Sequence, residues 1–272
     1  MICLKHAIGI PFAFLAVAFT SQAQAIPVDL ELSLVIDISP SINTSEYNLQ
    51  RQGYQSAFMD SGVQSAITSL PGGIATNVIF FSRSAVEKIS WTHLYDTNSI
   101  STFASAIGSL APTGVLRSGT DIADGYNLAI NSFANGFEGS RKVIDISADG
   151  PQNLNSGCPA FGDGSDAGCI AQTSSARAAA EQAGIVVNGL AIAPDEFPGG
   201  DGLGYLQNQI ITSTGFAVSA DDFEDFADTI TDKIFREITD PDPTPVPVPE
   251  PGTFGLLLLG FLAVTARRRV AR

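Results

Sequence analysis

Apolar residues in the middle of the chain follow two alternating periods. Short, mostly apolar runs rich in β-branched residues predict strands, and segments with apolar residues three or four apart predict helices between them. The predicted strands cover 30–39, 73–82, 84–94, 142–149 and 185–193, and the predicted helices cover 43–61, 97–110, 120–135, 170–184 and 221–238. Strands that alternate with helices indicate a mostly parallel sheet covered on both faces.

One pair of strands departs from this alternation. Only Arg83 separates the second predicted strand from the third, which leaves room for a tight hairpin but not for a helical crossover. We therefore expect a doubly wound α/β fold, with a mostly parallel sheet, one antiparallel edge strand and helices on both faces. In such sheets, ligands bind beyond the carboxyl ends of the strands.

Two of the predicted helices carry clear local signals. Asn43 and Glu46 have the spacing of a capping box at the start of the first helix. The last helix places Lys233 and Arg236 near its end, where the helix dipole favours positive charge. Its apolar face is predicted to be buried through residues at helical spacing, which are Phe223, Phe226, Ile230, Ile234 and Ile238.

The first 25 residues have the plan of a secretory signal peptide. Lys5 and His6 begin the segment, an apolar run follows over 7–19, and small residues stand at Ala23 and Ala25. We expect signal peptidase to cleave after Ala25. The apolar run is shorter than the ~20 residues of a membrane-spanning helix, which argues against a permanent anchor.

The other end of the chain holds a linker and a second targeting segment. Residues 240–248 form a proline-rich linker, which favours an extended spacer. Residues 249–272 contain Pro249, Glu250 and Pro251, then a short apolar run and three consecutive arginines. Arginines that close an apolar run predict a short transmembrane run with its basic end in the cytoplasm.

This order of features resembles the PEP-CTERM sorting signal of Gram-negative bacteria. The resemblance implies export through the inner membrane, transient anchoring by the C-terminal segment, and processing by an exosortase-type enzyme. The expected destination is the cell surface, the outer membrane or the extracellular matrix.

Charge and cysteine content agree with an exported protein. The chain has 14 Lys and Arg against 28 Asp and Glu, a net charge of −14. Removal of residues 1–25 and of the tail after Glu250 takes away five basic residues and no acidic ones. This leaves nine basic residues against 28 acidic ones, a net charge of −19. Such a surface repels nucleic acid, so we exclude nucleic-acid binding. Cys158 and Cys169 remain in an oxidising compartment, where a disulfide is expected.

Polar side chains follow the first predicted strand at alternate positions. Asp37, Ser39 and Ser41 would begin on one face where the strand ends, because residues two apart on an extended chain point the same way. One carboxylate and two hydroxyls are hard oxygen ligands, which suit Mg²⁺, Mn²⁺ or Ca²⁺. A carboxylate at the end of an apolar strand also needs a counter-charge or several hydrogen-bond donors. An EF-hand loop starting at Asp37 is excluded, because Ile42 and Asn48 replace its glycine and glutamate.

Two further oxygen ligands are expected at the same edge. Asp149 ends the fourth predicted strand, and Thr120 opens a helix after a turn that contains glycine. Together, "DISPS", "SGTD" and "SADG" resemble the metal-ion-dependent adhesion site (MIDAS) of von Willebrand factor type A (vWA) domains. The resemblance covers the domain at 26–239, including the "GLAI" strand and the acidic last helix. The segments "LQRQGYQSAF", "RKVIDISADGPQN" and "DDFEDFADTI" resemble, more narrowly, a bacterial vWA-like family of unassigned function.

The resemblance implies a metal held by Asp37, Ser39, Ser41, Thr120 and Asp149, with one open position that a carboxylate of a partner fills. The expected function is adhesion to an extracellular protein or polysaccharide. Two alternatives remain, a structural matrix protein stabilised by its metal and a metal-assisted hydrolase. The hydrolase has little support, because His93 is the only histidine outside the signal peptide and no general base accompanies the ligands. We therefore predict that the protein is not an enzyme.

Overall fold

The computed structural model describes residues 25–114, 117–154, 157–159, 162 and 164–240. These residues contain one sheet of six strands in the order β3-β2-β1-β4-β5-β6. All neighbouring strands are parallel except β2 and β3, which form the expected antiparallel hairpin at one edge. The strands are β1 (Ile26–Asp37), β2 (Ile74–Phe81), β3 (Ala85–Leu94), β4 (Phe137–Ala148), β5 (Val186–Ile192) and β6 (Ala217–Ala220).

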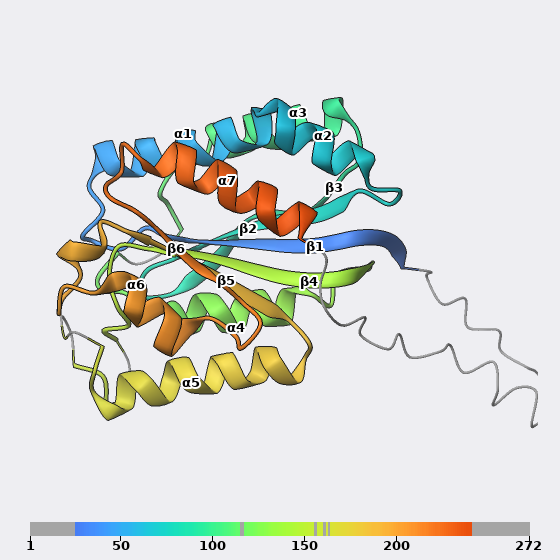
Figure 1. Cartoon of the computed structure of the whole chain (residues 1–272). Helices are drawn as coiled ribbons and strands as arrows, with labels where there is room; N and C mark the ends of the chain where they lie inside the picture. The colour runs from blue at the N-terminus through green and yellow to red at the C-terminus, as the bar shows by residue number, and fades with distance from the viewer. Residues whose placement is uncertain (1–24, 115–116, 155–156, 160–161, 163, 241–272) are drawn as a thin grey trace, which may run out of the picture.

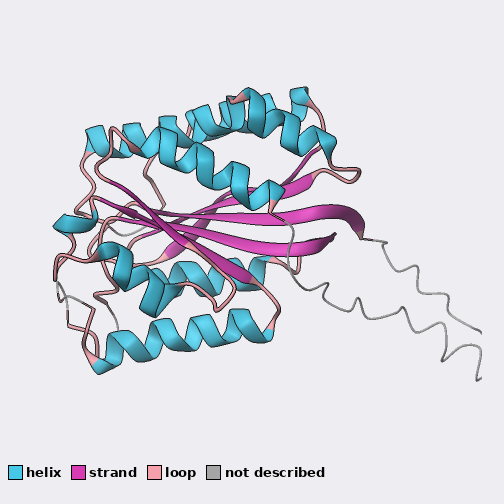
Figure 2. Cartoon of the chain, in the orientation of Figure 1, coloured by secondary structure: helices cyan, strands magenta, loops and turns pink. Residues whose placement is uncertain are grey.

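Helices cover both faces of this sheet (Figure 1), so the predicted doubly wound α/β fold is confirmed. On one face lie α1 (Thr44–Met59), α2 (Ser61–Ser69), α3 (Thr97–Gly108) and α7 (Phe226–Thr239). On the other lie α4 (Ile122–Ser132), α5 (Ala167–Gln182) and α6 (Gly202–Tyr205). Figure 2 shows the resulting three layers, helix, sheet and helix. Short turns complete the part after β5, namely η1 (Pro194–Glu196) and η2 (Leu206–Ile210).

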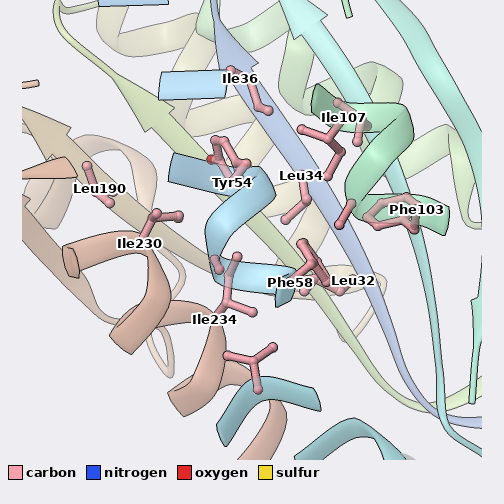
Figure 3. Close-up of a cluster of buried hydrophobic side chains, with 14 of the residues drawn as sticks. Leu32, Leu34, Ile36, Tyr54, Phe58, Phe103, Ile107, Leu190, Ile230 and Ile234 are labelled. Carbon is pink, nitrogen blue, oxygen red and sulfur yellow. The ribbon is translucent and has the colours of Figure 1, made fainter. Parts of the chain in front are cut away.

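Each face of the sheet has its own hydrophobic core. Leu32, Leu34 and Ile36 of β1 point toward α1, α3 and α7, whose Phe58 and Phe103 meet at a ring distance of 5.0 Å (Figure 3). The alternate residues of the sheet pack against α4 and α5 in a second core. The predicted apolar face of α7 is confirmed, because Phe223 just before it and all four predicted residues within it are buried.

Local signals explain several helix ends. The capping box at α1 is present, with the Asn43 side chain accepting from the backbone of Glu46 and the Glu46 carboxylate accepting from the backbone of Asn43. Asp60 ends α1 and caps α2, so the single predicted helix over 43–61 is in fact followed by a second one. The sequence pattern did not predict β6, a strand of only four residues, nor α6 and η2.

Lys233 occupies a different environment from the one expected at the end of a helix. Its ammonium is fully buried, 2.6 Å from Asp145 Oδ1 and 2.6 Å from Glu237 Oε1. Asp145 lies on β4, so this cluster joins α7 to the centre of the sheet. The interpretation of Lys233 as a charge that complements the helix dipole was therefore wrong.

The chain order places a switch point between β1 and β4. From β1 the chain moves outward to β2 and β3 on one side, and later returns to β4 on the other side. Loops at the carboxyl ends of β1 and β4 therefore diverge, and a crevice at this point is the usual ligand site of such sheets. The start of β1 and the end of α7 lie at the opposite end of these strands. There, Arg141 of β4 donates to the carbonyls of Ile238 and Asp240.

Candidate metal centre

The five predicted ligands lie in three loops at the switch point. Asp37 is the last residue of β1, and Ser39 and Ser41 lie in the loop that leads from β1 to α1. Asp149 follows β4 directly, and Thr120 lies two residues before α4. The parallel arrangement of β1 and β4 therefore brings loops that are over 100 residues apart in the sequence to one edge.

Four of the five side chains lie in one hydrogen-bonded group. The Ser39 amide donates to Asp37 Oδ1 at 2.7 Å, and the Ser39 and Ser41 hydroxyl oxygens lie 2.9 Å apart. Asp149 Oδ1 accepts from Ser41 Oγ at 2.9 Å and from Ser39 Oγ at 3.5 Å. Residues from β1 and from the end of β4 therefore converge, as the sequence predicted.

Thr120 is buried at the same edge but bonds to a different neighbour. Its amide donates to Asn153 Oδ1 at 2.7 Å, and its hydroxyl accepts from Asn153 Nδ2 at 3.5 Å. No hydrogen bond joins Thr120 to the other four predicted ligands within the described residues. Asn153, which lies four residues after Asp149, thus ties Thr120 to the loop that follows β4.

The electrostatics of the two aspartates favour a bound cation. Asp37 is fully buried, and its Oδ2 has no hydrogen-bond partner among the described residues. Burial, followed by the nearby Asp149 carboxylate, raises the pKa of Asp37 well above its ordinary value. Burial likewise raises the pKa of Asp149 to about 6, although the bond from Ser41 opposes this shift. Both shifts arise because the protein alone does not compensate the two negative charges.

The donor set fits a hard divalent cation. Two carboxylates and three hydroxyls supply only oxygen, which Mg²⁺, Mn²⁺ and Ca²⁺ prefer. In the part of the chain that the structure describes, no three His, Cys, Asp or Glu side chains gather as a metal cluster. A metal at this edge would therefore depend on the serine and threonine hydroxyls as well as on the two aspartates.

Sequence reasoning missed the residues that hold these loops together. Arg117 donates to three carbonyl oxygens of the β1–α1 loop, namely those of Ile38, Ser39 and Ile42. Gln152 is buried and accepts from the Ala123 amide at 3.0 Å, in the first turn of α4. The only available signal for such residues was the pair of side-chain amides, Gln152 and Asn153, in "GPQN" after Asp149, since buried Gln and Asn need several hydrogen-bond partners.

The predicted disulfide between Cys158 and Cys169 is present. Cys169 lies in the first turn of α5, and Cys158 follows the segment that carries Gln152 and Asn153. The bond therefore fixes the loop after Asp149 to a helix. Gly119, at φ 126°, lies against this loop, because a Cβ there would be 2.6 Å from the Leu154 side chain.

Replacing both cysteines by serine is expected to lower the free energy of unfolding by about 2 to 3 kcal/mol. The reason is that closure of a short loop no longer restricts the unfolded chain. Urea unfolding of the oxidised wild type and the double variant measures this difference. Equal midpoints for the two proteins would contradict the prediction.

The two targeting segments lie outside the described residues. The expected signal peptide ends at Ala25, the first residue that the structure describes, and Pro249, Glu250 and Pro251 lie beyond the last one, residue 240. None of the helices within residues 25–240 that the structure describes is long and apolar enough to cross a membrane.

Solved structures with a similar fold support the vWA assignment. Proximal thread matrix protein 1 from the mussel byssus matches with a TM-score of 0.51 and 18% identity, over 80% of this chain and 47% of that one. A further structure of that protein is described with zinc in its MIDAS motif, with a TM-score of 0.52 and 18% identity over 77% and 46% of the two chains. This chain therefore spans about half the length of these proteins. At this identity the likeness shows the fold alone.

Two bacterial surface proteins have the same fold. The pilus adhesin SpaC from Lactobacillus rhamnosus GG matches with a TM-score of 0.54 and 15% identity, over 77% of this chain and 31% of that one. The minor pilin PilB from Streptococcus sanguinis matches with a TM-score of 0.53 and 18% identity, over 82% and 65%. These neighbours are adhesin, pilin or matrix proteins by name.

Family models cover most of the chain. No curated protein matches it. The PEP-CTERM protein-sorting motif matches residues 247–269, which confirms the resemblance of the tail and implies export with C-terminal anchoring in a Gram-negative bacterium. The model described as "Protein of unknown function (DUF1194)" matches residues 27–242, and with its vWA-like fold the chain belongs to this family.

Proposed function

We propose that this protein is an exported adhesin that binds a carboxylate of an extracellular partner through a divalent metal. Asp37, Ser39, Ser41, Thr120 and Asp149 would hold the metal, either directly or through water. The observation that carries the proposal is the buried Asp37 carboxylate, whose Oδ2 has no partner beside a second carboxylate and two hydroxyls. A cation compensates both charges, whereas a purely structural role for these loops leaves Asp37 unexplained.

The bound metal would supply a positive centre that attracts a carboxylate oxygen of the partner. The serine hydroxyls are suited to hold such a centre, because they are neutral and do not cancel its charge as further carboxylates would. Ser41 is exposed, so this side of the group is accessible to a macromolecule. We assign Mg²⁺ as the first choice of metal, with Mn²⁺ and Ca²⁺ as alternatives.

The placement of the site suits a protein that is anchored by its C-terminal end. The ligands lie at the carboxyl ends of β1 and β4, and α7 ends beside Arg141 toward the other end of β4. A spacer and sorting segment at 240–272 would thus attach to the side of the domain that faces away from the metal. The proposed arrangement is a signal peptide at 1–25, a vWA-like domain at 26–239, a linker at 240–248 and the sorting segment at 249–272.

Binding to immobilised carboxylate polymers tests this function. The purified protein is expected to bind either alginate or poly-glutamate in Mg²⁺ and to be released by EDTA, because the metal provides the attraction. Asp37→Ala is expected to abolish the binding. Biolayer interferometry with each polymer measures it, and the two polymers distinguish a polysaccharide partner from a protein partner.

Asp195→Asn is the matched control. Asp195 is exposed in η1, after the carboxyl end of β5, and among the described residues no hydrogen bond or ion pair joins it to the proposed ligands. Its loss removes one negative charge from the same edge and should leave metal-dependent binding intact. Binding that persists in EDTA, or that survives Asp37→Ala, would count against the proposed function.

A further inference from the structure

Arg117 connects two of the three ligand loops. It belongs to the segment between α3 and α4, three residues before Thr120. Its Nε donates to the Ile38 carbonyl at 2.7 Å, and its Nη2 donates to the Ser39 carbonyl at 2.9 Å and also to that of Ile42. One guanidinium therefore spans the whole turn in which Ser39 and Ser41 lie.

This contact has a clear structural reason. The turn from Ser39 to Ile42 has its own backbone bond, from the Ile42 amide to the Ser39 carbonyl at 3.1 Å. Ile38 and Ile42 lie between the end of β1 and the start of α1, and Arg117 supplies a donor to the backbone carbonyl of each. The planar fork of an arginine is pre-organised to bind several acceptors at once, which a lysine does less well.

A second connection joins the same segment to the loop after β4. The Thr120 amide donates to Asn153 Oδ1, and the Asn153 amide donates back to the Thr120 carbonyl at 2.9 Å. Arg117 and Asn153 thus tie the segment of Thr120 to the loop of the two serines and to the loop of Asp149. The positions of all three ligand loops depend on this central segment.

We propose that Arg117 is a positioning residue, which holds the β1–α1 loop in its metal-binding conformation. The proposal rests on the proposed metal site. The direction of the effect is informative, because the positive charge of Arg117 opposes a nearby cation. A residue that acted only through its charge would weaken metal binding, and its removal would strengthen it. A residue that positions the serine ligands has the opposite effect on removal.

The test compares Arg117→Gln with Arg83→Gln in the full purified protein. Arg83 is exposed after β2, on the loop where the Asp121 amide donates to the Ser82 carbonyl, and it forms no ion pair within the described residues. It therefore reports the effect of losing one positive charge at this edge. Isothermal titration calorimetry with Mg²⁺, Mn²⁺ and Ca²⁺, each alone, gives the affinity of each variant.

Arg117→Gln is expected to weaken metal binding by about 10- to 100-fold, as is typical when a residue that orients metal ligands is lost. Arg83→Gln is expected to leave the affinity unchanged or slightly increased. Hydrogen exchange without metal should rise in the peptide that contains Ser39 and Ser41 for Arg117→Gln only, which reports the loop without requiring metal.

The outcomes separate this inference from the proposed function. Unchanged or tighter metal binding by Arg117→Gln, with a wild type that binds metal, would overturn the positioning role and leave the metal site intact. A wild type that binds none of Mg²⁺, Mn²⁺ and Ca²⁺ would overturn the metal site itself. An equal loss of affinity in both arginine variants would also reject the inference, because it would show a general effect of charge.

Discussion

Replacing Lys233 by methionine is expected to lower the free energy of unfolding by about 3 to 5 kcal/mol. The ammonium lies 2.6 Å from Asp145 and 2.6 Å from Glu237, and all three side chains are buried. Methionine matches the length of the lysine stem but leaves two carboxylates without a counter-charge. The cost is therefore the burial of uncompensated charge, which exceeds the net value of the ion pairs.

The loss should depend on pH in a defined direction. Burial and the Asp145 carboxylate raise the pKa of Glu237 to about 7, above its ordinary value of 4.5. Between these values the folded state holds a proton that the unfolded state releases, so this group lowers stability as the pH rises through that window. Without Lys233, whose positive charge opposes this shift, the pKa of Glu237 rises further. The destabilisation by methionine should thus be largest near pH 8 and smaller near pH 5.

A triple variant provides the matched control. Lys233→Met combined with Asp145→Asn and Glu237→Gln removes all three charges and keeps the side-chain volumes similar. It should be more stable than Lys233→Met alone, and less dependent on pH. Urea unfolding at both pH values measures each protein. A single variant as stable as the wild type at pH 8 would contradict the ionic description of the cluster.

This cluster also shows where sequence reasoning reached its limit. The period of α7 correctly predicted that Phe226, Ile230 and Ile234 are buried, because apolar side chains at helical spacing have only one plausible environment. Lys233 adjoins that face and has a charge that suits a helix end equally well. Only the register of α7 over β4 shows that Asp145 lies beneath it, and such register is a tertiary property.

The candidate site was predictable to a different degree. The alternation of Asp37, Ser39 and Ser41 and the polar end of β4 follow from strand geometry, and a parallel sheet brings these ends together. Four of the predicted residues do meet in one group. Arg117 was not predictable, because its acceptors are backbone carbonyls and carry no residue-specific signal. Short elements such as β6 were missed for a similar reason, since four residues give too little periodicity.

Asp37→Asn is expected to change stability in opposite directions with and without metal. In EDTA the variant should be more stable than the wild type by about 1 to 3 kcal/mol, because it removes a buried negative charge that lies near the Asp149 carboxylate. Asparagine keeps the acceptor for the Ser39 amide, which lies 2.7 Å from Asp37 Oδ1. The change therefore isolates the charge from the local hydrogen bond.

With Mg²⁺ the order should reverse. At a concentration about 1,000 times the dissociation constant, metal binding stabilises the folded wild type by about 4.1 kcal/mol, and Asp37→Asn should show almost none of this gain. Thermal unfolding in EDTA and in Mg²⁺ measures both effects, with Asp195→Asn as a control that should follow the wild type. A wild type with the same melting temperature in both solutions would contradict the metal site. A variant that is less stable than the wild type in EDTA would instead show that the protein alone stabilises the Asp37 carboxylate, without need of a cation.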